Sequence, residues 1–113
     1  MKTLTDLACQ NFLASHHERI ENCGNGIFRW KDAANEIIDE TSWLQIAHDV
    51  EWKIHWSDYF PAICNIVEHD WNQNSDVKYY NLPPAHRAWL VIHATYQQRA
   101  IALAKVLGKE LAE

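Results

Sequence analysis

The residues best suited to chemistry in this chain are two histidines and a glutamate near its middle. His48, Glu51 and His55 are spaced by three and four residues, which would place them on one helix face within an arc of about 60°. Imidazole and carboxylate groups are ligands for zinc or iron. His48 and His55 would lie roughly 10 Å apart along the axis, so one ion would need a ligand from another helix. The alternatives are a metal-dependent helical enzyme, completed by His69 or a carboxylate, and a solvated polar face.

Two tryptophans lie beside this row. The inward face of the same predicted helix is marked by four apolar residues, Trp43, Ala47, Val50 and Ile54. Trp52 and Trp56 project from the opposite half. A large aromatic side chain on a polar face either packs in a second core layer or is left for a partner. Core packing, a partner interface and a homodimer that buries Trp52 and Trp56 all fit this pattern.

Acidic residues are concentrated in the middle of the chain. The net charge of the 113 residues is −5, but residues 32–76 carry ten acidic groups against one lysine, a net charge of −9. Such a surface is attracted to a basic groove on another protein, and basic grooves are common where nucleic acid binds. A domain that binds nucleic acid directly is normally net positive. We therefore expect a protein partner and no direct contact with nucleic acid.

Motifs that would indicate catalysis are missing from the sequence. It has no Gly-rich phosphate loop, no serine nucleophile elbow and no C-x-x-C pair. Glu36, Asp39 and Glu40 share part of a face, as in helical pyrophosphatases that hold magnesium, but the second acidic pair of that class is missing. We therefore expect no catalytic residue, no resident metal and no cofactor.

The predicted fold is a single all-α domain spanning residues 1–113. Three glycines and three prolines are too few for an all-β chain with its frequent turns. Apolar periodicity predicts helices over residues 4–21, 31–40, 42–56, 58–71 and 82–107. Gly24 to Gly26 would end the first helix, and Ser42 with Gln45 has the capping-box spacing that would begin the third.

The last predicted helix is the longest. Its main apolar stripe consists of Trp89, Ile92, Tyr96, Ala100, Leu103 and Leu107. A second, weaker stripe lies on another side, and a helix that is apolar on two sides is typically central in a bundle. We therefore predict a compact bundle of four to five helices with a long central C-terminal helix.

The expected compartment is the cytoplasm. No apolar run reaches the roughly 18 residues that a membrane span needs, and the N-terminal segment lacks the uninterrupted apolar centre of a secretory signal. The three cysteines show neither disulfide nor metal spacing, which favours a reducing compartment.

Together these observations favour a non-enzymatic protein-binding module. It would be an inhibitor or adaptor that docks on a basic, for example nucleic-acid-binding, surface of a partner. Phage and mobile-element inhibitors, anti-CRISPR proteins among them, are often small, acidic and without motifs, and the chain resembles that class in this general character alone. The predicted binding surface consists of His48, Asp49, Glu51, Trp52, His55 and Trp56, with the neighbouring carboxylates Asp39 and Glu40.

Overall fold

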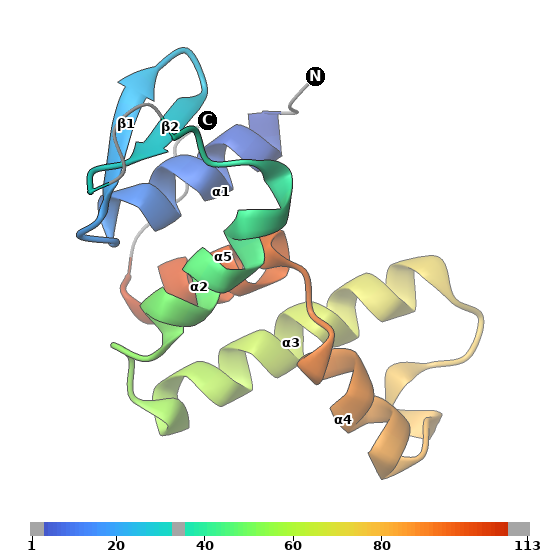
Figure 1. The fold of residues 1–113 in the computed structure, drawn as a ribbon. Coiled ribbons are helices and arrows are strands. Elements are labelled where there is room, and N and C mark those ends of the chain that lie inside the picture. The colour runs from blue at the N-terminus through green and yellow to red at the C-terminus, as the bar shows by residue number, and fades with distance from the viewer. Residues whose placement is uncertain (1–3, 33–35, 109–113) are drawn as a thin grey trace.

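The computed structural model describes residues 4–32 and 36–108 and is mostly helical (Figure 1). Among these residues there are five α-helices: α1 (Leu4–Ser15), α2 (Trp43–Glu51), α3 (Trp56–Asn74), α4 (Pro84–Ile92) and α5 (Tyr96–Val106). The remaining elements are a hairpin of β1 (Ile20–Gly24) and β2 (Ile27–Trp30), and the short 3₁₀ helices η1 (Glu40–Ser42) and η2 (Tyr79–Asn81). The prediction of a purely all-α fold is therefore wrong in one part, the hairpin. No described helix combines the length and the apolar character needed to cross a membrane.

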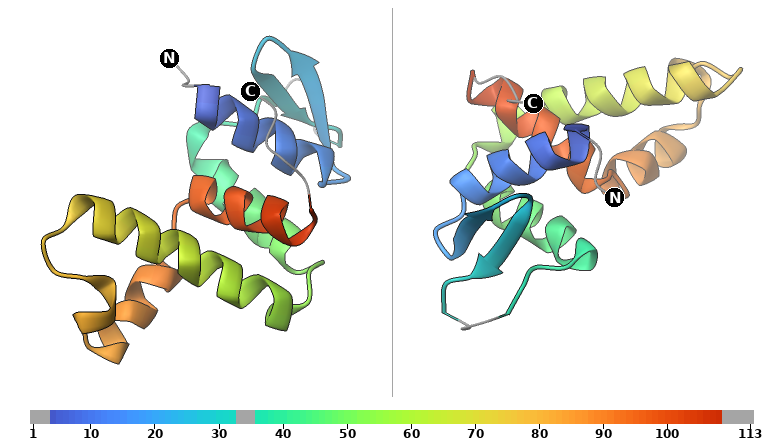
Figure 2. Two further views of the ribbon diagram at one scale, coloured as in Figure 1. Left: turned by 180° about the vertical axis from the view of Figure 1, so that it is seen from behind. Right: turned by 90° about the horizontal axis from the view of Figure 1, so that it is seen from above.

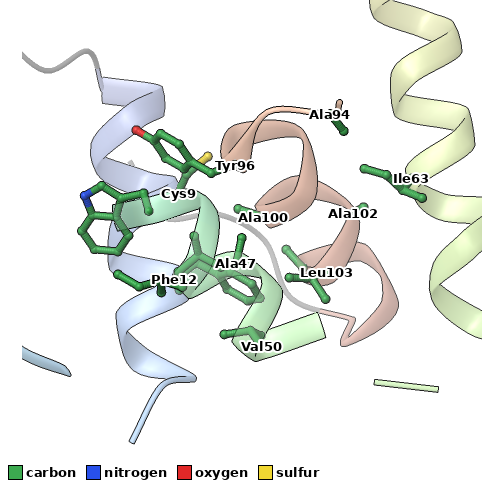
Figure 3. Packing of buried hydrophobic residues seen from close by; sticks show 14 of the residues in the cluster. Cys9, Phe12, Ala47, Val50, Ile63, Ala94, Tyr96, Ala100, Ala102 and Leu103 are labelled. Carbon is green, nitrogen blue, oxygen red and sulfur yellow. The ribbon is translucent and has the colours of Figure 1, made fainter. Parts of the chain in front are cut away.

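Helix α5 lies at the centre of the helices. It packs against α1, α2 and α3, and Figure 2 shows it between α1 and α3. Ala100, Ala102 and Leu103 in this helix are fully buried, and the small alanines let neighbouring helices approach closely (Figure 3). Helix α4 packs against α3 instead, and the two extend away from α1 and the hairpin (Figure 1).

The long C-terminal helix predicted over residues 82–107 is broken into α4 and α5, and α5 has only 11 residues. The break is stabilised by a capping box. Thr95 Oγ1 accepts a hydrogen bond from the Gln98 backbone N–H at 3.1 Å, and Gln98 Oε1 accepts one from the Thr95 N–H at 2.9 Å. Thr-x-x-Gln is a start signal for a helix, and the unbroken apolar periodicity around it concealed that signal.

This break divides the predicted apolar stripe. Trp89 and Ile92, in α4, are 54% and 69% exposed. The three stripe residues within α5 are all buried, Tyr96, Ala100 and Leu103. The periodicity therefore identified the buried face of α5 correctly, whereas on α4 it identified residues that the fold leaves at the surface.

The predicted first helix ends early, at Ser15, and the chain continues into the hairpin. Ile20 pairs with Trp30 across the two antiparallel strands. Residues 24–26 have φ values of 85°, 56° and 75°, a region that glycine and asparagine favour. They form the hairpin turn and do not end a helix. Asn-Gly before the β-branched and aromatic run of β2 is a hairpin signal.

The helix predicted over residues 31–40 is absent from the part of this segment that the structure describes. Residues 33–35 lie outside the described residues. Ile37 forms an isolated bridge with Arg29, and the Ile38 N–H donates to the Phe28 carbonyl at 2.9 Å. The segment therefore continues along the hairpin in an extended form, because its backbone groups find partners on β2.

The start of α2 also differs from the prediction. The Asp39 carboxylate accepts hydrogen bonds from the backbone and the hydroxyl groups of Thr41 and Ser42, at 2.7 to 3.1 Å. These two hydroxyl donors hold the pKa of Asp39 below its ordinary value. Ser42 thus donates to Asp39 and does not form the predicted capping box with Gln45; Asp39 caps η1, which leads into α2.

A buried ion pair joins α2, α3 and α5. Arg99, 6% exposed, donates from Nη1 to Glu51 Oε1 at 2.8 Å, from Nε to the Ala94 carbonyl at 3.0 Å, and from Nη2 to the Ile92 carbonyl at 2.7 Å. Tyr59, 2% exposed, donates its hydroxyl to the same Glu51 oxygen at 3.0 Å. Burial, and next the Glu51 charge, raise the pKa of Tyr59, so its hydroxyl keeps the proton that it donates.

This network fixes where three helices end or begin. The Ile92 and Ala94 carbonyls lie at the end of α4, where backbone carbonyls lack helical partners, and Arg99 supplies them with donors. Glu51 is the last residue of α2, and Tyr59 lies in the first turns of α3. The turn between α2 and α3 therefore brings the Tyr59 hydroxyl to the Glu51 carboxylate.

We predict that Arg99→Met lowers the free energy of unfolding by about 3–5 kcal/mol, because it leaves the Glu51 carboxylate buried without its cation. The control is Arg19→Met, which removes an ion pair with Asp32 whose side chains are 64% and 54% exposed. That change should stay within about 1 kcal/mol. Urea unfolding of both variants measures the difference, and equal losses would contradict the assigned role of Arg99.

Candidate functional site

Four of the eight predicted binding residues meet at the corner between α2 and α3. A pocket of ≈ 470 Å³ opens there, and we call it the corner pocket; its lining residues are His48, Glu51, Trp52, Ile54 and Trp56. Glu51 ends α2, Trp56 begins α3, and Trp52 and Ile54 lie in the turn between them. The corner therefore exists because α2 stops at Glu51, five residues before the end predicted from periodicity.

Both tryptophans of the corner pocket are at the surface. Trp52 is 88% exposed and Trp56 is 62% exposed, so neither packs in a second core layer. Trp56 stacks on Phe60, with ring centroids 4.9 Å apart and planes tilted by 35°. Phe60, 42% exposed, extends the aromatic surface along α3. The sequence analysis missed Phe60, although its spacing of four residues from Trp56 places the two on one helix face.

His55 is separated from the other residues of the predicted row. It is the N-cap of α3, in an extended conformation, and its Nδ1 accepts a hydrogen bond from the Ser57 N–H at 3.3 Å. The Ser57 hydroxyl lies 2.6 Å from the same nitrogen. His48, Glu51 and His55 therefore do not share one helix face, because the helix that would align them ends at Glu51. Over residues 4–32 and 36–108, no three His, Cys, Asp or Glu side chains are grouped to hold a metal ion.

The two oxygens of the Glu51 carboxylate have different surroundings. Oε1 accepts from Arg99 and Tyr59, inside the protein. Oε2 lies 3.4 Å from His48 Nδ1, and His48 is 39% exposed. The buried network thus holds the carboxylate in place by one oxygen, while the other lies beside a residue that lines the corner pocket.

The other predicted carboxylates do not line the corner pocket. Asp49 Oδ2 lies 2.9 Å from His17 Nε2, and Asp49 Oδ1 accepts from Gln45 at 3.1 Å. Burial acts to raise the pKa of Asp49, but the hydrogen bonds from His17 and Gln45 prevail and hold it below its ordinary value. Asp39 caps η1, and Glu40 is exposed in that 3₁₀ helix. Asp49 and Asp39 therefore each hold hydrogen bonds within the protein, and their predicted place in a binding surface stays a prediction.

A second aromatic group lies between α3 and α4. Trp89 contacts His93 with ring centroids 4.3 Å apart, and His86 lies between Trp89 and Trp71, at 6.4 Å and 5.5 Å. A pocket of ≈ 350 Å³ adjoins this row. Trp89, at 54% exposed, resembles Trp56 in exposure but lies outside the corner pocket, which makes it a matched reference for experiments on Trp56.

Comparison with family models, with curated proteins and with solved structures found no match to this chain. The chemistry of the corner pocket therefore carries the functional argument. Its lining combines the indoles of Trp52 and Trp56, the carboxylate side chain of Glu51, the imidazole of His48 and the apolar side chain of Ile54. These groups suit recognition of a cationic or planar group by stacking and hydrogen bonding.

We predict that Trp52→Ala and Trp56→Ala each change the free energy of unfolding by no more than about 0.5 kcal/mol, because neither side chain is buried. Trp43→Ala is the control. Trp43 is 1% exposed and meets Phe28 edge-on, so its loss should cost about 3–5 kcal/mol. Urea unfolding of the three variants tests this, and a large loss for Trp52→Ala would remove the argument for an interface.

We also predict a pH-dependent stability loss at Asp49. Its pKa is lower in the folded protein than its ordinary value of 3.8, so its contribution is complete above that value and is lost as the pH falls through the folded pKa. Asp49→Asn should destabilise the protein by roughly 0.5–1 kcal/mol at pH 7. The difference from the unmodified protein should shrink as the pH falls below 3.8 and through the folded pKa of Asp49. Asp76→Asn, on an exposed residue, is the control; a pH-independent difference for Asp49→Asn would contradict the assignment.

Proposed function

We propose that this protein is a non-enzymatic binding module whose corner pocket docks on a basic surface of another protein. The exposure of Trp52 and Trp56 at one pocket carries the proposal. Keeping a large indole in water is unfavourable, and tryptophan is the residue type most enriched among the hot spots of protein interfaces. Two such side chains around a pocket form the kind of anchor on which an interface is centred.

The charge of the chain supports a basic partner. Residues 32–76 have a net charge of −9. Within this segment Asp49 and Glu51 face His17 and Arg99, so the outward field comes mainly from exposed carboxylates. Asp58 is one of these, and it follows Trp56 by two residues on α3. Opposite charges speed and orient the encounter more than they strengthen the complex.

A protein that binds nucleic acid is the partner class that best fits this chemistry, because its phosphate-binding groove presents arginine and lysine together. If docking blocks the groove, this protein is an inhibitor, as anti-CRISPR proteins are. If docking attaches a further protein to the partner, this protein is an adaptor. The geometry does not support the alternative of a metal-dependent enzyme, because the Glu51 carboxylate is held by Arg99 and the His55 ring caps α3.

The test begins with a photo-crosslinking phenylalanine analogue in place of Phe60, which is exposed beside Trp56, in the native host, and identification of the crosslinked protein. The purified partner is then titrated with the unmodified protein, Trp52→Ala and Trp56→Ala. Each variant should bind about 30-fold more weakly, the effect of losing a hot-spot residue of about 2 kcal/mol. The association rate of the unmodified protein should fall as salt is added.

Trp89→Ala is the matched control, since Trp89 is similarly exposed but lies on α4; it should leave the affinity unchanged. Competition between this protein and nucleic acid for the partner would support inhibition, whereas a ternary complex would support an adaptor. Unchanged affinity of both corner variants would refute the proposal, as would a partner whose crosslinked surface is acidic.

A further inference from the structure

Within residues 4–32 and 36–108, one oxygen of Glu51, which lines the corner pocket, accepts no hydrogen bond of ordinary length. Glu51 Oε1 already accepts from Arg99 Nη1 and from the Tyr59 hydroxyl. Oε2 has the His48 ring at 3.4 Å, a distance longer than that of a charge-assisted hydrogen bond. A carboxylate accepts on both oxygens, so Oε2 has capacity for one more donor from the pocket side.

Trp52 and Trp56 line the same pocket as Glu51, and indole rings attract cations through their faces. Trp52 is the C-cap of α2 and Trp56 is the first residue of α3, so the two lining residues flank the turn between these helices. Ile54 adds an apolar surface between them in the sequence. The combination of an aromatic face, an aliphatic wall and a carboxylate oxygen is complementary to a group that is planar, cationic and joined to methylenes.

We infer that the corner pocket takes an arginine side chain of the partner, with its guanidinium on an indole face and an N–H donated to Glu51 Oε2. The inference deepens the proposed function and rests on it. One carboxylate would then serve two guanidinium groups, Arg99 on Oε1 inside the protein and the partner's arginine on Oε2 from outside.

Arginine fits this pocket better than lysine does. Its guanidinium is planar and weakly hydrated, and it stacks on an aromatic face while donating in its own plane. An ammonium group is compact and strongly hydrated, so it would give up more hydration to enter. Because Glu51 and Arg99 nearly cancel each other in charge, selection would depend on stacking and on hydrogen-bond geometry as well as on attraction to exposed carboxylates such as Asp58.

Among the described residues, His48 is the neighbour recorded at the same oxygen. Its Nδ1 is already on the Oε2 side, and its side chain is 39% exposed, so a longer cationic side chain at this position can reach the carboxylate without disturbing the core. His48→Lys should therefore occupy Oε2 with its own ammonium group and exclude the incoming guanidinium. His93→Lys is the matched control, because it makes the same substitution at an exposed histidine at the end of α4, outside the corner pocket.

The experiment uses the full chain and three capped tripeptides, Gly-Arg-Gly, Gly-Lys-Gly and Gly-citrulline-Gly. Binding is followed through the indole N–H signals of Trp52 and Trp56 in ¹H–¹⁵N NMR, assigned with the two alanine variants. The arginine peptide should bind with a dissociation constant on the order of 1 mM. We expect several-fold weaker binding of the lysine peptide and no saturable shift with citrulline, which keeps the planar shape but lacks the charge.

The variants complete the test. His48→Lys should abolish the shifts caused by the arginine peptide, whereas His93→Lys should keep the affinity within about twofold, because its added charge lies outside the pocket. Equal binding of the citrulline peptide, or shifts of Trp71 and Trp89 as large as those of Trp52 and Trp56, would overturn the inference. If the corner variants lose the partner but the arginine peptide does not bind, the inference alone fails. If the peptide binds but the partner is unaffected by the corner variants, the proposed function fails.

Discussion

Arg99 lies inside the protein with each of its three guanidinium nitrogens bound to a different acceptor: Glu51 from α2 and the carbonyls of Ile92 and Ala94 between α4 and α5. A buried cation is tolerated only when it is paired and its donors are satisfied. These acceptors come from segments far apart in the chain, so α2, the end of α4 and α5 must adopt their mutual positions together. Tyr59 brings α3 to the same carboxylate, and the corner between α2 and α3 follows from that constraint.

The Glu51 carboxylate connects this interior to the surface. Its Oε1 belongs to the buried network, and its Oε2 lies beside His48 in the lining of the corner pocket. A recognition group held in this way costs little entropy to order on binding, since the fold has already ordered it. The two tryptophans are held less firmly than the carboxylate. Trp52 is 88% exposed, and Trp56 is supported by its stacking on Phe60.

The sequence singled out the segment that holds Trp52 and Trp56 but did not predict the path of its backbone. Trp43, Ala47 and Val50 are buried, as the helical periodicity predicted. Trp52 and Trp56 lie together at one pocket, although the single helix from residue 42 to residue 56 that led to their selection does not exist. Apolar periodicity could not distinguish one long helix from two helices joined by a turn. The local signals at such a break, a cap or a tight turn, are worth about 1 kcal/mol, less than the tertiary interactions that compete with them.

The amino-acid sequence alone determined the helical character of most of the chain, the inward residues of α2 and α5, and the acidic middle segment. It also singled out residues 48 to 56 for their histidines and tryptophans. Only the tertiary structure decided where the helices break, that residues 20 to 30 form a hairpin, and that His55 leaves the row while Glu51 turns inward. The physical reason is the separation of the partners. Glu51 and Arg99 are 48 residues apart in the chain, so periodicity and capping cannot register their pairing, and the pair forms only when α2, the end of α4 and α5 are packed together.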